Sequence, residues 1–146
     1  MIRASFNPVF VIACYLALLV VSSCKKDDNS PGTASAVSTT VSSGAWKVTY
    51  YLERDVDHTA SFAGYAFTFN SNGAVAAVKT GNTVNGTWSA GNDDSKVKFI
   101  LNFIAPDPFE EISEDWRVTE RTDTKLTLEH VSGGDGHIDY LTFEKN

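Results

Sequence analysis

The stretch that decides the fold is VKFILNF, residues 97–103. Every second residue from Val97 to Phe103 is apolar, and polar residues occupy most of the positions between them. A period of two is typical of a β-strand that buries one face. The stretch WKVTYYLE, residues 46–53, has the same alternation, and its inner phase begins at Trp46 and includes Tyr50. Both stretches therefore predict strands with one buried face.

Six further runs are rich in the Val, Phe, Tyr, Trp and Thr that strands favour, and we expect strands at about 61–70, 74–80, 83–90, 114–122, 125–131 and 137–144. Short connections rich in Gly, Asn and Asp, such as Ser71-Asn72-Gly73, separate most of them and supply the positive φ of tight hairpins. The apolar residues of the last run do not keep one phase, so we expect a bulge there. Eight sequential strands predict an all-β fold, an eight-stranded up-and-down antiparallel barrel, because closure removes exposed edges.

The first 23 residues have the layout of a secretory signal. One cation, Arg3, precedes an uninterrupted apolar run at residues 9–21, and two small residues, Ser22 and Ser23, follow it. The run would reach only about 20 Å as a helix, which is short of the roughly 30 Å hydrocarbon core. We interpret residues 1–23 as a cleaved signal peptide.

The tetrapeptide that ends at Cys24, Val-Ser-Ser-Cys, resembles the lipobox of bacterial lipoproteins. The resemblance implies that Cys24 receives a diacylglycerol and becomes the first residue of the mature chain, which would then be anchored to a membrane. An ordinary secreted protein with a chance cysteine is the alternative. The only other cysteine, Cys14, lies in the signal, so the mature domain must fold without a disulfide.

Four charged residues follow the cysteine: Lys25, Lys26, Asp27 and Asp28. They resemble the signal that directs lipoproteins of the Bacteroidota to the outer face of the outer membrane, which implies a cell-surface location. The alternative is a solvated charge cluster. Because residues 29–43 are rich in Ser, Thr, Ala, Gly and Pro, we expect residues 24–43 to form a flexible lipidated tether.

We expect residues 44–146 to form one domain of ordinary size. From Glu53 to Glu144 it carries sixteen acidic residues, against nine Lys and Arg from Lys47 to Lys145, a net charge of −7. No basic patch is available for phosphate, so we expect no nucleic-acid partner. We expect a monomer.

Five short motifs follow one another along this domain: GAW at 44–46, YAFTFNSNG at 65–73, GTWS at 86–89, DWRV at 115–118 and LTFEK at 141–145. Together they resemble the lipocalin-like domains of Bacteroidota lipoproteins, which implies a lipocalin-like barrel. Lipocalins proper add a carboxy-terminal helix, and this sequence ends at its last expected strand.

The sequence contains no familiar catalytic arrangement, such as Gly-x-Ser-x-Gly or His-Glu-x-x-His, so we expect no enzyme activity and no cofactor. We expect His58 in a solvated turn and His130 turned inward on the phase of Leu126 and Leu128. The acidic residues 107–115 and those near Asp135 could bind calcium but lack EF-hand spacing, so a solvated cluster is the simpler interpretation.

The remaining indication of function is the set of aromatic residues on the inner face of the expected strands. On the inner phase lie the side chains that would either form the core or line a ligand site: Trp46, Tyr50, Phe67, Trp88, Phe99 and Trp116. An eight-stranded barrel is filled by side chains or holds one small ligand, and this many large residues favours filling. Three hypotheses follow: an interaction module that contacts a surface protein or glycan, a carrier for a small apolar or aromatic ligand, and an enzyme.

Overall fold

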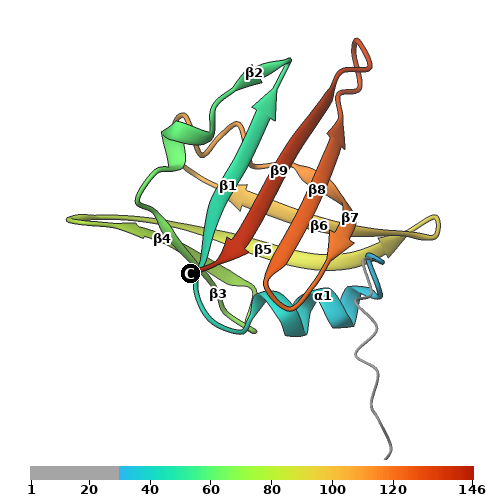
Figure 1. Ribbon diagram of the computed structural model, residues 1–146, viewed down its shortest axis with the longest axis horizontal. Helices are drawn as coiled ribbons and strands as arrows, with labels where there is room; N and C mark the ends of the chain where they lie inside the picture. The colour runs from blue at the N-terminus through green and yellow to red at the C-terminus, as the bar shows by residue number, and fades with distance from the viewer. Residues whose placement is uncertain (1–29) are drawn as a thin grey trace, which may run out of the picture.

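The computed structural model describes residues 30–146, so the expected signal peptide at 1–23, Cys24 and the charged residues Lys25–Asp28 lie outside the described residues. Over residues 30–146 the chain forms a closed, antiparallel up-and-down barrel, as predicted, with one α-helix (Figure 1). From β3 to β9 each strand pairs with the next one in the sequence, and β1 pairs with both β3 and β9, which closes the barrel. The elements are α1 (Ala34–Val41), β1 (Trp46–Glu53), β2 (Val56–Asp57), the 3-10 turn η1 (Thr59–Phe62), β3 (Ala66–Phe69), β4 (Ala74–Lys79), β5 (Asn82–Asp93), β6 (Lys96–Phe103), β7 (Asp115–Arg121), β8 (Lys125–Val131) and β9 (Ile138–Lys145).

The segment before the first expected hairpin differs from the prediction. The expected strand at about 61–70 shrinks to β3, Ala66–Phe69, because η1 occupies Thr59–Phe62 and Gly64 takes a φ of 83°. That φ lies in the left-handed region, which interrupts an extended strand and which glycine adopts without strain. The short β2 pairs only with the C-terminal end of β1, where Glu53 faces Val56. It therefore adds a ninth strand beside the eight that close the barrel.

A β-bulge in β1 overturns the prediction for Tyr50. Val48 pairs with Phe143 and Tyr50 with Thr142, so Thr49 has no partner on β9 and the phase of β1 changes after it. Tyr50 consequently faces outward with 40% of its surface exposed, and Tyr51 is buried at 1%.

The bulge that we expected in the last strand is absent there. The β8–β9 register is continuous from Lys125 opposite Glu144 to Val131 opposite Ile138. The irregularity that adjusts the phase is in β1, on the other side of β9.

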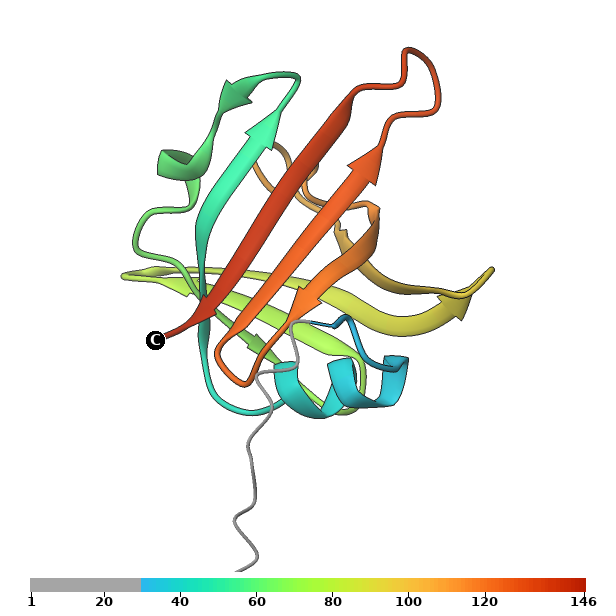
Figure 2. The same cartoon turned by 45° about the vertical axis from the view of Figure 1, so that its right-hand side comes forward.

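The prediction of a flexible tether through Ser43 is wrong for residues 34–41, which form α1. The side chain of Thr33 caps the helix by accepting a hydrogen bond from the amide of Ala36. Val37 and Val41, one turn apart, are fully buried against the barrel. Figures 1 and 2 show α1 lying across one end of the barrel, beside the turn that joins β7 to β8. We call this end the α1 end. Within residues 30–146, no helix is long and apolar enough to cross a membrane.

The opposite end, which we call the loop end, is formed by the β1–β2 turn, η1, the 104–114 loop and the 132–137 loop (Figure 1). Three buried side chains close it from the connecting segments: Phe62 of η1, and Phe109 and Ile112 of the 104–114 loop. The ring centroid of Phe109 lies 5.6 Å from that of Phe62 and 5.0 Å from that of Phe103. The core therefore extends from α1 to this loop, and both ends are covered.

Candidate functional site

The predicted aromatic residues, apart from Tyr50, face the barrel interior but do not gather at one point. Trp46, Phe67, Phe99 and Trp116 are at most 1% exposed, and Trp88 is 7% exposed. Trp46 and Trp88 lie toward the α1 end, where the indole N–H of Trp46 donates to the carbonyl of Val41 at 2.9 Å. Trp116 lies toward the loop end.

The tryptophans also fasten connecting segments to the barrel. The indole N–H of Trp88 donates to the carbonyl of Asn70 at 2.9 Å, and that of Trp116 donates to the carbonyl of Ile112 at 3.0 Å. Because every indole donor is satisfied within the chain, burial of these polar groups costs little. These hydrogen bonds are typical of tryptophans that stabilise the fold.

Phenylalanine rings fill the middle of the barrel. The centroids of Phe67 and Phe143 are 5.2 Å apart, and Phe69 lies 5.5 Å from both Phe143 and Phe99, all in edge-to-face geometry. These are ordinary spacings for packed aromatic pairs. A molecule that entered here would have to displace close-packed rings, which a close-packed interior resists.

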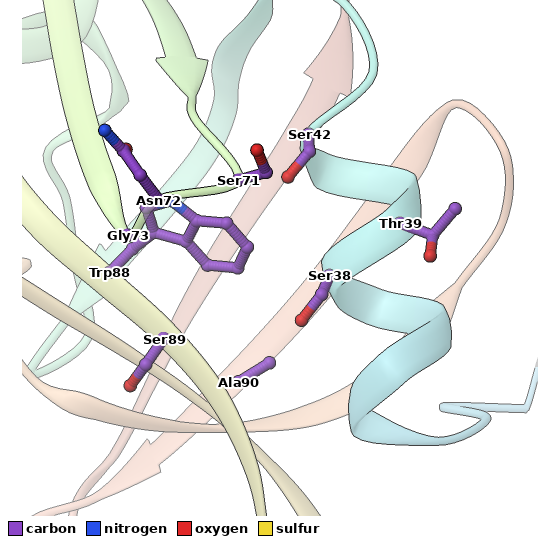
Figure 3. Close-up of a pocket in the computed structure, with 9 residues that line it drawn as sticks. All are labelled: Ser38, Thr39, Ser42, Ser71, Asn72, Gly73, Trp88, Ser89 and Ala90. Carbon is purple, nitrogen blue, oxygen red and sulfur yellow. The ribbon is translucent and has the colours of Figure 1, made fainter.

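A groove of about 500 Å³ lies outside the barrel, between α1 and the β3–β5 part of the wall (Figure 3). The Ser71-Asn72-Gly73 turn forms one side, and residues 88–90 of β5 form its base. Figure 3 shows Ser38 and Ser42 directed from α1 toward the indole of Trp88, and Thr39 directed away. The nine lining residues are Ser38, Thr39, Ser42, Ser71, Asn72, Gly73, Trp88, Ser89 and Ala90.

The lining of this groove is neutral and rich in hydroxyl groups, so it offers hydrogen bonds and one aromatic edge but no charge. Its volume is in the range of small-molecule sites. Sequence reasoning missed the groove because it depends on α1, which was expected to be a tether. The signal that could have found it is the spacing of Val37 and Val41, which places two apolar residues on one helix face.

A second, smaller pocket of about 180 Å³ lies at the loop end, where Glu53, Asp107 and Glu111 meet beside His58 and Tyr51. The hydroxyl of Tyr51 lies 3.2 Å from Glu53 Oε2 and 3.2 Å from the carbonyl of Glu111. A hydrogen bond with Glu53, helped by burial and by the charges of Glu53 and Asp107, raises the pKa of Glu111 to about 7. Burial, with the charge of Glu53, raises the pKa of Tyr51 far above its ordinary value.

The histidines and acidic clusters that the sequence singled out take peripheral positions. His130 is partly buried at the rim, where its ring nitrogens lie 3.6 Å from Glu114 Oε2 and 3.8 Å from Asp139 Oδ2. The amide of His58 donates to the carbonyl of Tyr51. Across residues 30–146, no three His, Cys, Asp or Glu side chains are grouped so that they could hold a metal ion.

No protein-family model matches the chain, and no curated protein matches its sequence. Among solved structures, the chain is similar to the crystal structure of a DUF4847 family protein from Bacteroides vulgatus, with a TM-score of 0.51 and 19% sequence identity. The match covers 75% of this chain and 97% of that one. At this identity the likeness shows a common barrel fold and says nothing of a common ligand.

Proposed function

We propose that the chain is a cell-envelope lipoprotein whose barrel is a non-catalytic interaction module that meets its partner on its outer surface. The observation that carries the proposal is the aromatic filling of the barrel. Because Phe67, Phe69 and Phe143 occupy the middle and both ends are covered, the surfaces available for contact are the outer wall, the groove beside α1 and the loops.

The packed interior also separates this proposal from the carrier hypothesis. A carrier needs an enclosed space of about 300 Å³ or more with a few inward polar groups. The pockets described above lie outside the wall or at its rim, and hydroxyl or carboxylate side chains line them beside apolar groups. A partner protein or a glycan suits such surfaces better than an apolar molecule does.

The sequence of the amino terminus supports the envelope location. The apolar run at 9–21, the small residues before Cys24 and the charged residues 25–28 follow one another in the order that a lipoprotein signal requires. Two or more acyl chains on Cys24 would give a stable anchor, since one chain alone binds membranes only marginally. The outer face of the outer membrane is the proposed location.

Substitution of the two cysteines tests the anchor. Cys24→Ser removes the acceptor sulfur, so we expect the precursor to stay unprocessed and to incorporate no radiolabelled palmitate in growing cells. Cys14→Ser is the matched control, because it makes the same change inside the discarded segment and should leave labelling and processing intact. Mature-mass, membrane-bound Cys24→Ser protein would contradict the proposal.

A further inference from the structure

We infer that the barrel stands on the membrane with its α1 end toward the lipid and its loop end facing away. The inference rests on the proposed lipid anchor at Cys24 and names the surface that a large partner can reach.

The chain is fixed to the barrel well before β1. Val37 and Val41 are fully buried, and the guanidinium of Arg121 donates to the hydroxyl of Thr40 at 3.1 Å. The same guanidinium lies against Gly32, where an added Cβ would come within 3.2 Å of Arg121 Nε. The attached region therefore begins at about Gly32, and Cys24 lies eight residues before this point in the sequence.

The distance that these eight residues can bridge is limited. They span at most about 26–29 Å, the length of a fully extended chain. β1 has eight residues, and a strand of that length rises about 26 Å. Because barrel strands tilt by about 35–45° from the axis, β1 spans roughly 20 Å along it. An inverted barrel would therefore use most of the reach of these eight residues, whereas the proposed orientation uses little of it.

Charge favours the same orientation. The segments 53–58, 104–114 and 132–137 of the loop end contain eight carboxylate residues and one cation, Arg54. An anionic phospholipid surface repels such a cluster, and this repulsion falls off within a Debye length. The cluster is therefore most stable away from the lipid.

The orientation divides the two pockets between two environments. The groove beside α1 lies near the lipid headgroups, where a bulky partner has little access. The loop end, with Glu53, Asp107 and Glu111, stands free and is the surface that a large partner can meet.

Energy transfer from the barrel to the membrane tests the orientation. Asp123→Cys places a thiol on the exposed β7–β8 turn at the α1 end, and Gly133→Cys places one on the exposed 132–137 loop. The full chain is expressed with its export signal, purified as the lipidated form, labelled with a fluorescent donor and incorporated into phosphatidylcholine–phosphatidylglycerol vesicles. The vesicles carry an acceptor on their headgroups.

We expect transfer efficiency from position 123 to be at least about twofold higher than from position 133, because their distances from the membrane differ by roughly the 20 Å that a tilted strand spans along the barrel axis. A ten-residue Gly/Ser insertion after Asp28 should reduce this difference without touching the barrel. Equal transfer from both positions in the uninserted chain, with the protein bound to the vesicles, would overturn the orientation alone. Labelled protein that remains free of the vesicles would overturn the anchor, and the orientation with it.

Discussion

At Thr49 the pairing of β1 with β9 slips by one residue, and this slip decides which of two adjacent tyrosines enters the core. The alternation from Trp46 predicts an inward Tyr50, and nothing in the sequence around Thr49 marks the bulge. The side chain that enters is Tyr51, whose hydroxyl reaches Glu53 and the 104–114 loop. Identical side chains at 50 and 51 hide the change of phase, because either tyrosine fits a core position by composition.

The two tyrosines provide a matched pair of substitutions. Tyr51→Ala should lower the free energy of unfolding by about 3–5 kcal/mol, as large-to-small aromatic changes in a core do. Tyr50→Ala on the exposed face should change it by only about 0.5 kcal/mol. Urea unfolding of residues 30–146, followed by circular dichroism, measures both. Equal losses from the two variants would show that the bulge is misplaced.

The helix α1 and the 104–114 loop cover the two ends of the barrel, and the sequence predicts the structure of neither segment well. The segment ASAVSTTV, residues 34–41, is poor in strong helix formers and resembles linker in composition, so only the spacing of Val37 and Val41 indicates its buried face. Its helical structure depends on tertiary contacts with the barrel, which local propensity does not report. For the 104–114 loop, the prolines indicate a break in the strands, but not that Phe109 and Ile112 turn inward to close the core.

The 104–114 loop, which contains Glu111, should make the stability of the folded chain depend on pH. Glu111 has a pKa of about 7 in the folded chain, above its ordinary 4.5, because Glu53 and Asp107 lie beside it. The folded state then holds a proton that the unfolded chain releases, so stability is fully present below about pH 4.5 and declines as pH rises through 7. Urea midpoints between pH 5 and pH 8 should fall accordingly.

The charge-removing variant Glu111→Gln should flatten this decline, whereas the neighbouring change Glu110→Gln should leave it in place. A wild-type midpoint that rises over the same interval would contradict the assignment.

On the scale of the whole molecule, the period of two and the Gly/Asn/Asp turns were enough to predict the closed barrel. The strand WKVTYYLE was predicted at the observed bounds, 46–53, although the alternation that predicted it changes phase at Thr49. The aromatic residues indicated a large core, and Trp46, Phe67, Phe99 and Trp116 are buried in it. The groove beside α1 could not be predicted, because it requires contacts between residues 38–42 and 71–90 that no local pattern specifies.

The central claim is that the barrel is filled and that its partner meets the outside. Titration of residues 30–146 with palmitate, retinol and haemin, followed by tryptophan fluorescence, tests it most directly. The packed rings of Phe67, Phe69 and Phe143 predict no saturable quenching by any of the three ligands. Trp88→Phe removes the indole beside the outer groove and so separates binding there from binding inside. Saturable quenching at micromolar ligand that persists in Trp88→Phe, and is lost in Trp116→Phe with unchanged circular dichroism, would contradict the claim and establish a carrier.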